Sequence, residues 1–273
     1  MPELPEVETI ASRLAAHLPG AVIESVHIHR ADIIHHGGET VASGLTGMRV
    51  AAVDRHGKRL FVRLDGGDLV VHLGMTGWLT LLPASEPVLP HTHVRFAFTG
   101  RTDELRFRDP RRFGGIWFFG AGENGQAQRL NTLGPDALSI RVPVLRTLLK
   151  RRRQIKALLM DQQAISGLGN IYCDEALFSA RIHPLTLAAA LSESQVRNLA
   201  CAIRKVLRAS IRSGGTTISD YRGADGQQGD FQNRLRVYDR EGGPCTRCGA
   251  KIRRILAAGR STHYCPRCQK RRR

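Results

Sequence analysis

The sequence lacks the features of a membrane or exported protein. None of its stretches approaches the roughly 20 consecutive apolar residues that a membrane-spanning helix requires. Its amino end carries Glu3, Glu6 and Glu8, where a signal peptide would have basic residues followed by an apolar run. Internal repeats and low-complexity tracts are also absent, apart from the arginines at 271–273. These absences predict a soluble protein of the cytoplasm with no membrane partner.

Acidic residues are scarce relative to basic ones. The 273 residues include 41 Lys and Arg but only 24 Asp and Glu, which gives a formal net charge of +17. Residues 240–273 hold eleven of the basic residues and a single acid, Glu241. A second basic run covers residues 150–153 and Lys156. The imbalance favours a polyanionic partner, and the two runs predict a track that binds the phosphates of a nucleic acid.

Cysteine is infrequent as well, and four of the six cysteines are grouped near the C-terminal end. Cys245 and Cys248 form one Cys-x2-Cys pair, and Cys265 and Cys268 form a second pair after sixteen intervening residues. This spacing is typical of a four-thiolate zinc site. Disulfide bonds are the alternative, but they are rare inside cells. Because sulfur would fill all four metal positions, we expect one structural zinc ion.

The order of apolar residues predicts an α+β fold. Residues 4–18 place apolar side chains at helical spacing, which predicts an N-terminal helix. Between residues 21 and 119, short runs rich in Val, Ile and Phe are separated by glycine-containing turns. Several strands without long helices between them predict an antiparallel β-sandwich or barrel. Examples of such runs lie at residues 22–28, 60–64, 69–73, 94–98 and 116–119.

The pattern becomes helical after residue 134. One helix is predicted over residues 172–180, and another is predicted to begin at Ser192, whose spacing to Gln195 resembles a capping box. Cys173 and Cys201 lie singly in these helices and are expected to be buried. The predicted domains are a β-sandwich domain at 1–134, a linker at 135–150, a helical domain at 151–238 with a glycine-rich loop at 214–230, and a zinc ribbon at 239–273.

Pro2 is a candidate nucleophile. Removal of Met1 would leave its secondary amine as the free terminus of the chain. The reference pKa of an α-amino group is about 8, so a useful fraction of this amine is uncharged near neutral pH. Condensation with an aldehyde carbon would give a cationic iminium, which is a strong electron sink. Glu3 and Glu6 are candidate proton-transfer groups beside it.

Five segments spread along the chain resemble one family. They are PELPEVET at 2–9, HLGMTG at 72–77, DPRRFG at 109–114, GLGNIYCDEALF at 167–178 and GRSTHYCPRCQ at 259–269. Together they resemble bacterial formamidopyrimidine-DNA glycosylases over essentially the whole chain. The resemblance implies an N-terminal helix and β-sandwich, a helix–two-turn–helix domain and a C-terminal zinc ribbon. It also implies a monomer that acts on double-stranded DNA containing oxidised purines.

The implied activity is that of a bifunctional DNA glycosylase and AP lyase of base excision repair. Such an enzyme removes 8-oxoguanine or a formamidopyrimidine and then cleaves the strand by β,δ-elimination. By this resemblance, Pro2 attacks C1′ of a nucleotide that has left the duplex. Glu3 helps to open the sugar ring, and Glu6 supports the network around the nucleophile. Zinc is the one implied cofactor, with no redox or nucleotide cofactor.

Lys58 and Arg260 complete the catalytic group that the resemblance implies. Lys58 assists proton transfer and binds phosphate near the lesion. Arg260 lies between the two cysteine pairs and contacts the phosphates that flank the lesion, for which the forked guanidinium is suited. The zinc ribbon would then hold Arg260 toward the reacting sugar.

The resemblance also implies residues that fill the space left by the everted base. Phe113 wedges into the base stack, Arg111 pairs with the orphaned cytosine, and Met75 occupies the void. By residue type alone, Met75 and Phe113 would be expected in the core. The glycine-rich loop at 214–230 corresponds to a segment that folds over the everted base. Further implied DNA contacts are His72, His91, Arg111, Arg151, Lys156, Asn170 and Tyr238.

Two other functions account for parts of the sequence. An endonuclease VIII-like glycosylase would apply the same chemistry to oxidised pyrimidines. That branch typically begins with a Pro-Glu-Gly-Pro-Glu pattern, so Leu4 favours the purine-directed branch. A non-catalytic zinc-ribbon DNA-binding protein would explain the charge and the cysteines. It would not explain why all of the implied catalytic residues are present.

Overall fold

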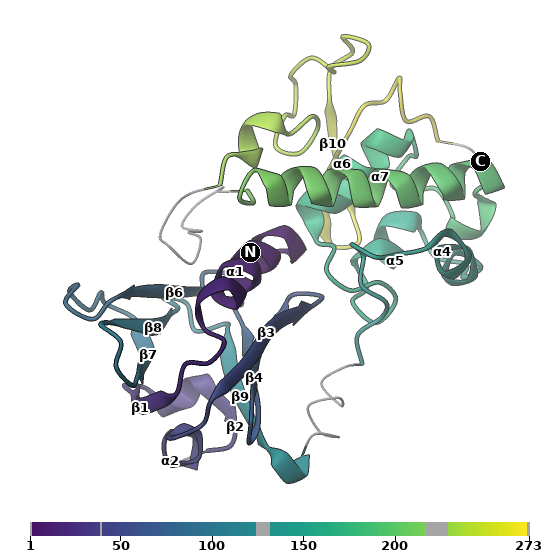
Figure 1. The fold of residues 1–273 in the computed structure, drawn as a ribbon. Helices are drawn as coiled ribbons and strands as arrows, with labels where there is room; N and C mark the ends of the chain where they lie inside the picture. The colour runs from purple at the N-terminus through teal and green to yellow at the C-terminus, as the bar shows by residue number, and fades with distance from the viewer. Residues whose placement is uncertain (1, 39, 124–131, 217–228, 272–273) are drawn as a thin grey trace. The chain divides into compact units, whose positions relative to one another are not determined.

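The structure is a computed structural model of the chain, and it describes residues 2–38, 40–123, 132–216 and 229–271. The chain folds into two compact units, which Figure 1 shows as ribbons. The first unit consists of Met1–Thr132 and Ser213–Asp230, and the second of Leu133–Arg212 and Phe231–Arg273. Among the described residues, no helix combines the length and the apolar character needed to cross a bilayer.

Two sheets form the first unit. The four-stranded sheet has the order β1–β7–β8–β6, and the five-stranded sheet has the order β2–β9–β5–β4–β3. The strands are β1 Ile23–Ile28, β2 Ile34–His36, β3 Val50–His56, β4 Arg59–Leu64, β5 Gly67–His72, β6 Trp78–Pro83, β7 Thr92–Phe98, β8 Asp103–Arg108 and β9 Gly115–Gly120. Neighbouring strands are antiparallel within the described residues, except for the short parallel pair of β2 and β9.

The core of the first unit lies between these sheets. Leu60 and Val62 on β4 are buried in one cluster with Phe96 and Phe107 of the other sheet. Phe61 lies between them in sequence but packs in a separate small cluster, because successive side chains of a strand point to opposite faces. The predicted β-sandwich is therefore confirmed.

Helix α1 (Leu4–His17) contacts both sheets of the first unit. It packs against β3, β4 and β6, and Figure 1 shows it in purple beside these strands. Val7, Ile10 and Leu14 on one helix face are buried. Pro5 lies in the first turn, where a missing N–H leaves no hydrogen bond unmade. This packing fixes the N-terminal residues against the sandwich.

The second unit is built around helix α6 (Asn170–Ala180). Three elements pack on it, namely α5 (Ile155–Met160), α7 (Glu193–Arg212) and β11 (Arg260–Tyr264). Ser192 and Gln195 cap α7 reciprocally, since the backbone N–H of each donates to the side-chain oxygen of the other at 3.0 and 3.3 Å. Helix α4 (Val142–Leu149) packs on α7 and lies within the segment predicted as a linker. That segment is a packed part of the unit.

Other elements of the chain are short. They are α2 Thr40–Leu45 and the 3-10 helices η1 Ala31–Ile33, η2 Ala121–Glu123, η3 Ala188–Ala190 and η4 Phe231–Arg234. Cys173 is buried as predicted, whereas Cys201 is exposed on α7, so the expected burial of Cys201 is wrong. The helical spacing of its neighbours places Cys201 on the outer face of the helix.

The zinc-ribbon segment contains a two-stranded hairpin. Strand β10 (Arg253–Ala257) pairs with β11, and Ala258 and Gly259 form the turn. Both turn residues have positive φ, at 52° and 67°. This geometry matches the twist of the two strands in a two-residue hairpin turn. Arg260 follows the turn directly and is exposed.

Candidate active site and nucleic-acid interface

The N-terminal residues are held by a buried carboxylate. Pro2 and Glu3 directly precede α1, and both are buried. Oε2 of Glu6 accepts a hydrogen bond from the backbone N–H of Glu3 at 2.8 Å. Its Oε1 accepts one from the backbone N–H of Thr216 at 2.7 Å. Glu6 therefore links the backbone beside Pro2 to the segment that precedes residues 217–228.

Gly215 permits the approach of that segment to Glu6. Its φ is +87°, and a Cβ at this position would lie 3.1 Å from both Cγ and Oε1 of Glu6. A larger residue would meet backbone strain and crowding together. Most of the predicted glycine-rich loop at 214–230, namely residues 217–228, lies outside the described residues.

An arginine links α1 to the turn that carries Lys58. Arg55 donates from Nε to Oε2 of Glu8 at 2.6 Å and from Nη1 to the carbonyl of Gly57 at 2.8 Å. The side chain of Arg55 is 5% exposed, whereas that of Glu8 is 27% exposed. Lys58 is itself buried in this turn. Sequence reasoning missed Arg55, because no local pattern marks an arginine whose partner lies on another element.

His72 lies beside Lys58 and Arg59 at the end of β5. Burial lowers the pKa of His72 to about 4, and the positive charges of Arg59 and Lys58 act in the same direction. The ring is therefore neutral near neutral pH. The backbone N–H of Gly74 donates to Nδ1 of His72 at 3.3 Å, which assigns the ring proton to Nε2. A neutral Nε2–H can still donate to a phosphate oxygen.

Met75 and Phe113 lie on the surface. Met75 is 40% exposed and Phe113 is 55% exposed, so the expectation from residue type that they belong to the core is wrong. The guanidinium of Arg111 lies 4.7 Å from the centroid of the Phe113 ring. His91 is also exposed and has a φ of 69°. The first unit thus presents apolar and cationic side chains outward.

Lys156 is buried beneath the hairpin that carries Arg260. Its Nζ donates to Oδ1 of Asp174 and to Oγ1 of Thr262, each at 2.7 Å. A longer hydrogen bond reaches the carbonyl of Ser261 at 3.3 Å. The predicted direct contact of Lys156 with DNA does not fit this position, because its side chain is 0% exposed and its donors are used. Lys156 supports the hairpin from below.

Asn170 reaches the same hairpin from the start of α6. Its Nδ2 donates to the carbonyl of Ser261 at 2.9 Å. Ser261 is the direct neighbour of Arg260, so the N-terminal end of α6 and the exposed guanidinium belong to one surface region. Backbone N–H groups at a helix N-terminus favour a phosphate.

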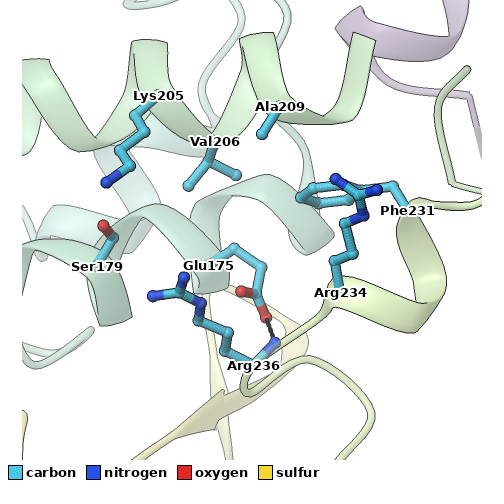
Figure 2. Close-up of a pocket in the computed structure, with 8 residues that line it drawn as sticks. All are labelled: Glu175, Ser179, Lys205, Val206, Ala209, Phe231, Arg234 and Arg236. Carbon is cyan, nitrogen blue, oxygen red and sulfur yellow. Dashed lines mark hydrogen bonds between the residues drawn. The ribbon is translucent and has the colours of Figure 1, made fainter. Parts of the chain in front are cut away.

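Glu175 on α6 positions the segment that contains Tyr238. Its Oε1 accepts hydrogen bonds from the backbone N–H groups of Arg236, Val237 and Tyr238, at 2.9, 2.8 and 3.0 Å. Figure 2 shows the first of them. Burial raises the pKa of Glu175, and these hydrogen bonds oppose that shift. The ring of Tyr238 packs edge-on against His263 at 5.3 Å between centroids.

A pocket of about 200 Å³ lies next to Glu175. Figure 2 shows Lys205, Arg234 and Arg236 around it, with Phe231 as an apolar wall. None of the predicted site residues lines this pocket.

The four clustered cysteines fit a zinc ion. Their Sγ atoms all lie within 4.8 Å of one another. The pair Cys245 and Cys268 is separated by 3.9 Å, and the pair Cys248 and Cys265 by 3.5 Å. In a tetrahedral site with Zn–S bonds of about 2.3 Å, the sulfur atoms lie about 3.8 Å apart.

The structure places the predicted site residues in two groups. The first unit contains Pro2, Glu3, Glu6, Lys58, His72, Met75, His91, Arg111 and Phe113. The second unit contains Arg151, Lys156, Asn170, Tyr238, Arg260 and the four zinc-site cysteines. Arg151 is exposed in the turn between α4 and α5.

Comparisons with known proteins decide the family. Residues 1–116 match the formamidopyrimidine-DNA glycosylase N-terminal domain, residues 133–222 its H2TH domain, and residues 242–271 the zinc finger found in FPG and IleRS. The formamidopyrimidine-DNA glycosylase of Geobacillus kaustophilus is 42% identical over 99% of this chain and 100% of its own length. That of Thermus thermophilus is 44% identical over 98% of both chains. The chain belongs to the formamidopyrimidine-DNA glycosylase family.

Solved structures similar to this chain are complexes with damaged DNA. A Lactococcus lactis FPG variant bound to Fapy-dG containing DNA is 34% identical and has a TM-score of 0.91, covering 99% of this chain and 100% of that one. MutM bound to carbocyclic 8-oxo-G containing DNA has a TM-score of 0.89 at the same identity and coverage. The predicted fold class and zinc cofactor are confirmed. The chain is a DNA-binding glycosylase and AP lyase of base excision repair with one structural zinc ion.

Proposed function

We propose that this glycosylase removes formamidopyrimidines and 8-oxoguanine from double-stranded DNA and cleaves the resulting abasic site through Pro2. The observation that carries the proposal is the clamp of Glu6 on the N-terminal backbone, which holds Pro2 at the start of α1. The relatives in complex with Fapy-dG and 8-oxo-G containing DNA support the substrate class. We also propose that it acts as a monomer on chromosomal DNA in the bacterial cytoplasm.

The first stage replaces the damaged base with the enzyme's amine. After removal of Met1, the nitrogen of Pro2 attacks C1′ of the everted nucleotide, and the bond between C1′ and the base breaks. The nitrogen passes its proton to the departing base, ring opening then breaks the bond between C1′ and O4′, and the freed electron pair of the nitrogen forms the iminium. Glu3, the next residue, is placed to donate the proton that O4′ takes. Glu6 keeps the backbone of Glu3 in position.

The second stage uses the iminium as an electron sink. Loss of a proton from C2′ expels the phosphate on the 3′ side, and loss of a proton from C4′ then expels the phosphate on the 5′ side. Lys58 and Arg260 are assigned to these phosphates and to the accompanying proton transfers. Arg55 holds the turn that carries Lys58, while the zinc ribbon supports the hairpin that carries Arg260.

The remaining predicted residues form the proposed DNA surface. His72, His91, Arg151, Asn170 and Tyr238 are assigned to the DNA backbone, and Met75, Arg111 and Phe113 to the gap left by the everted base. Lys156 acts through the hairpin. We assign these roles to the predicted domains, with catalysis in 1–134, DNA binding in 151–238 and in the zinc ribbon at 239–273, and cover of the everted base by 214–230.

Trapping with sodium borohydride tests the nucleophile. An 8-oxoguanine:cytosine duplex incubated with zinc-loaded protein and borohydride should give a covalent adduct, because the reductant converts the iminium into a stable amine. Mass analysis of the N-terminal peptide should locate the adduct on Pro2 and show that Met1 is absent. Protein acetylated at its amino terminus is the matched control and should give neither adduct nor strand cleavage.

Turnover and binding measurements on two duplexes distinguish the alternative functions. Faster turnover of a thymine glycol duplex than of an 8-oxoguanine duplex would indicate an endonuclease VIII-like substrate range. Tight binding of both duplexes without cleavage would indicate a non-catalytic DNA-binding protein. An adduct on a lysine in place of Pro2 would contradict the proposed mechanism.

A further inference from the structure

Asp109 is a buried carboxylate beneath the proposed DNA surface of the first unit. It directly follows β8 and is 0% exposed. It begins the DPRRFG segment, but it does not itself reach the surface. Neither the proposed chemistry nor the proposed DNA contacts give it a role, although a buried acidic residue needs strong hydrogen bonds to be tolerated.

The two carboxylate oxygens of Asp109 accept hydrogen bonds from Thr76 in segment 72–77 and from two residues of segment 109–114. Oδ1 accepts from the hydroxyl of Thr76 at 2.6 Å and from the backbone N–H of Arg111 at 3.2 Å. Oδ2 accepts from the backbone N–H of Gly114 at 2.7 Å. Hydrogen bonds to a carboxylate are stronger than those between neutral groups. The side chain therefore joins segment 72–77 to segment 109–114.

The donors are the direct neighbours of the proposed gap-filling residues. Thr76 follows Met75, Gly114 follows Phe113, and Arg111 is itself a donor through its backbone. One carboxylate thus determines the backbone position at all three gap-filling side chains. Because Met75 and Phe113 are 40% and 55% exposed, core packing does not hold them in place.

The backbone of Asp109 anchors a third segment. Its N–H donates to the carbonyl of His91 at 3.1 Å, and its carbonyl accepts from Nε2 of His93 at 2.8 Å. His91 is in the left-handed region of backbone space, with φ at 69°. Such a conformation persists only where surrounding contacts determine it. Asp109 therefore also restrains the exposed His91.

Segments 72–77 and 109–114 also meet backbone to backbone. A Cβ on Gly74 would lie 2.3 Å from the nitrogen of Gly114 and 2.4 Å from the carbonyl carbon of Phe113. Gly74 has a φ of +62°. No side chain fits between the two segments, so the hydrogen bonds of Asp109 act across a direct contact.

We propose that Asp109 is a positioning residue that sets the mutual placement of Met75, Arg111 and Phe113. It acts on eversion of the lesion and on recognition of the opposite base, and it takes no part in the chemistry at C1′. Unstacking a base step costs free energy, which replacement side chains recover only if they are presented at the correct positions. This inference rests on the proposed function of the same surface.

The variant Asp109→Asn tests the proposal with a nearly unchanged side-chain volume. An amide has one oxygen, so its NH2 group must face either Gly114 or the donors on Thr76 and Arg111. Two substrates distinguish an effect on the placement of the gap-filling side chains from an effect on the reaction at C1′. An 8-oxoguanine:cytosine duplex requires eversion and an opposite base, whereas a single-stranded oligonucleotide with an abasic site requires neither.

The expected result is a selective loss on the duplex. Single-turnover excision from the duplex should fall at least about tenfold, since displacements of about 1 Å cost up to about a hundredfold. The rate of cleavage at the single-stranded abasic site should stay within about twofold of that of the unmodified protein, because Pro2 and the hydrogen bonds of Glu6 are unchanged. A 2-aminopurine placed beside the lesion should show less unstacking in the variant.

Two further variants complete the test. Thr76→Val removes one donor to Asp109 and should cause a smaller loss in the same direction, which keeps the test available if Asp109→Asn does not fold. Asp103→Asn is the matched control. Asp103 lies at the other end of β8 from Asp109 and pairs with Arg101 at 2.7 Å. This variant should leave both substrates unaffected.

The outcomes distinguish the inference from the proposed function. If Asp109→Asn and Thr76→Val slow both substrates equally, Asp109 has only a structural role and the inference is overturned. Unchanged duplex excision in both variants overturns it as well. If the unmodified protein forms no borohydride adduct with the abasic strand, the proposed function itself fails, whatever the variants show.

Discussion

Nζ of Lys156 lies 2.7 Å from Oδ1 of Asp174, and the side chains of both residues are 0% exposed. The other oxygen of Asp174 accepts a hydrogen bond from the backbone N–H of His263 at 2.8 Å. The pair therefore connects α5 and α6 to β11. A buried charge pair is compensated only while both partners are present. The position of the Arg260 hairpin depends on this pair.

Replacement of Lys156 should destabilise the protein. In Lys156→Met, the carboxylate of Asp174 loses its partner, and the free energy of unfolding should fall by about 3–5 kcal/mol. Urea denaturation of zinc-loaded protein measures this loss. Lys205→Met, at an exposed position on α7, should change stability by no more than about 0.5 kcal/mol. A Lys156→Met protein of normal stability that binds DNA weakly would instead indicate a direct contact.

Glu6→Gln should slow base excision and abasic-site cleavage together. The amide offers a single acceptor oxygen, so the N–H of Glu3 or of Thr216 loses its partner. The expected loss of stability is about 1–3 kcal/mol, and displacement of Pro2 should slow both steps at least about tenfold. Single-turnover assays on lesion and abasic duplexes measure the two steps. Glu24→Gln, exposed on β1, is the control. Slower excision with normal cleavage would place Glu6 outside the support of the nucleophile.

The pKa of His72 makes stability depend on acid pH. Burial, followed by the charges of Arg59 and Lys58, lowers this pKa from 6.5 to about 4. The unfolded chain binds the proton first, so this histidine costs stability as the pH falls from about 6.5 to about 4 and has no effect above that window. Proton NMR should give a His72 midpoint near 4. His72→Gln should remove the corresponding part of the acid destabilisation, and a midpoint near 6.5 would contradict the structure.

Removal of zinc should abolish cleavage of duplex DNA. Without a metal, burial raises the pKa of the Cys268 thiol to about 12, so zinc must displace protons and its affinity should fall as the pH falls. A chelator should release one zinc ion per chain, detected with a zinc-sensitive dye, and duplex cleavage should fall in parallel. Cys265→Ser should reproduce this loss, while Cys201→Ser on the exposed face of α7 should not. Full cleavage by zinc-free protein would exclude a role of the ribbon in placing Arg260.

Strand β8 was not among the strand segments named from the sequence, because charged residues dominate its composition. In β8, Glu104 and Arg106 are 2% and 3% exposed, and Nε of Arg106 donates to Oε1 of Glu104 at 2.6 Å. Arg95 on the neighbouring strand donates to both oxygens of Glu104 at 2.8 Å. Leu105 and Phe107 belong to the core between the sheets, so Glu104 and Arg106 point to the opposite face of the sheet, where only their tertiary contacts bury them. The predicted strands at 60–64 and 94–98 contain more apolar residues than β8, and the structure confirms them.

Single residues of the site also differ in whether the sequence revealed them. The residues that support the predicted site, Arg55 and Asp109, were not predicted, because their partners come from other elements. Arg55 bonds to Glu8, which precedes it by 47 positions, and Asp109 bonds to Thr76, 33 positions before it. No local spacing reports such contacts.

Residue types and their spacing establish which reactive groups this protein has, namely a secondary amine near the N-terminus, four thiols at the spacing of a zinc ligand set, and an excess of positive charge. The fold then establishes which of these groups are exposed, buried or charged. It exposes Met75 and Phe113, buries Lys156, and holds His72 neutral. The reason is physical, because residue type and spacing are local, whereas burial and electrostatic environment are created by segments that the fold brings together.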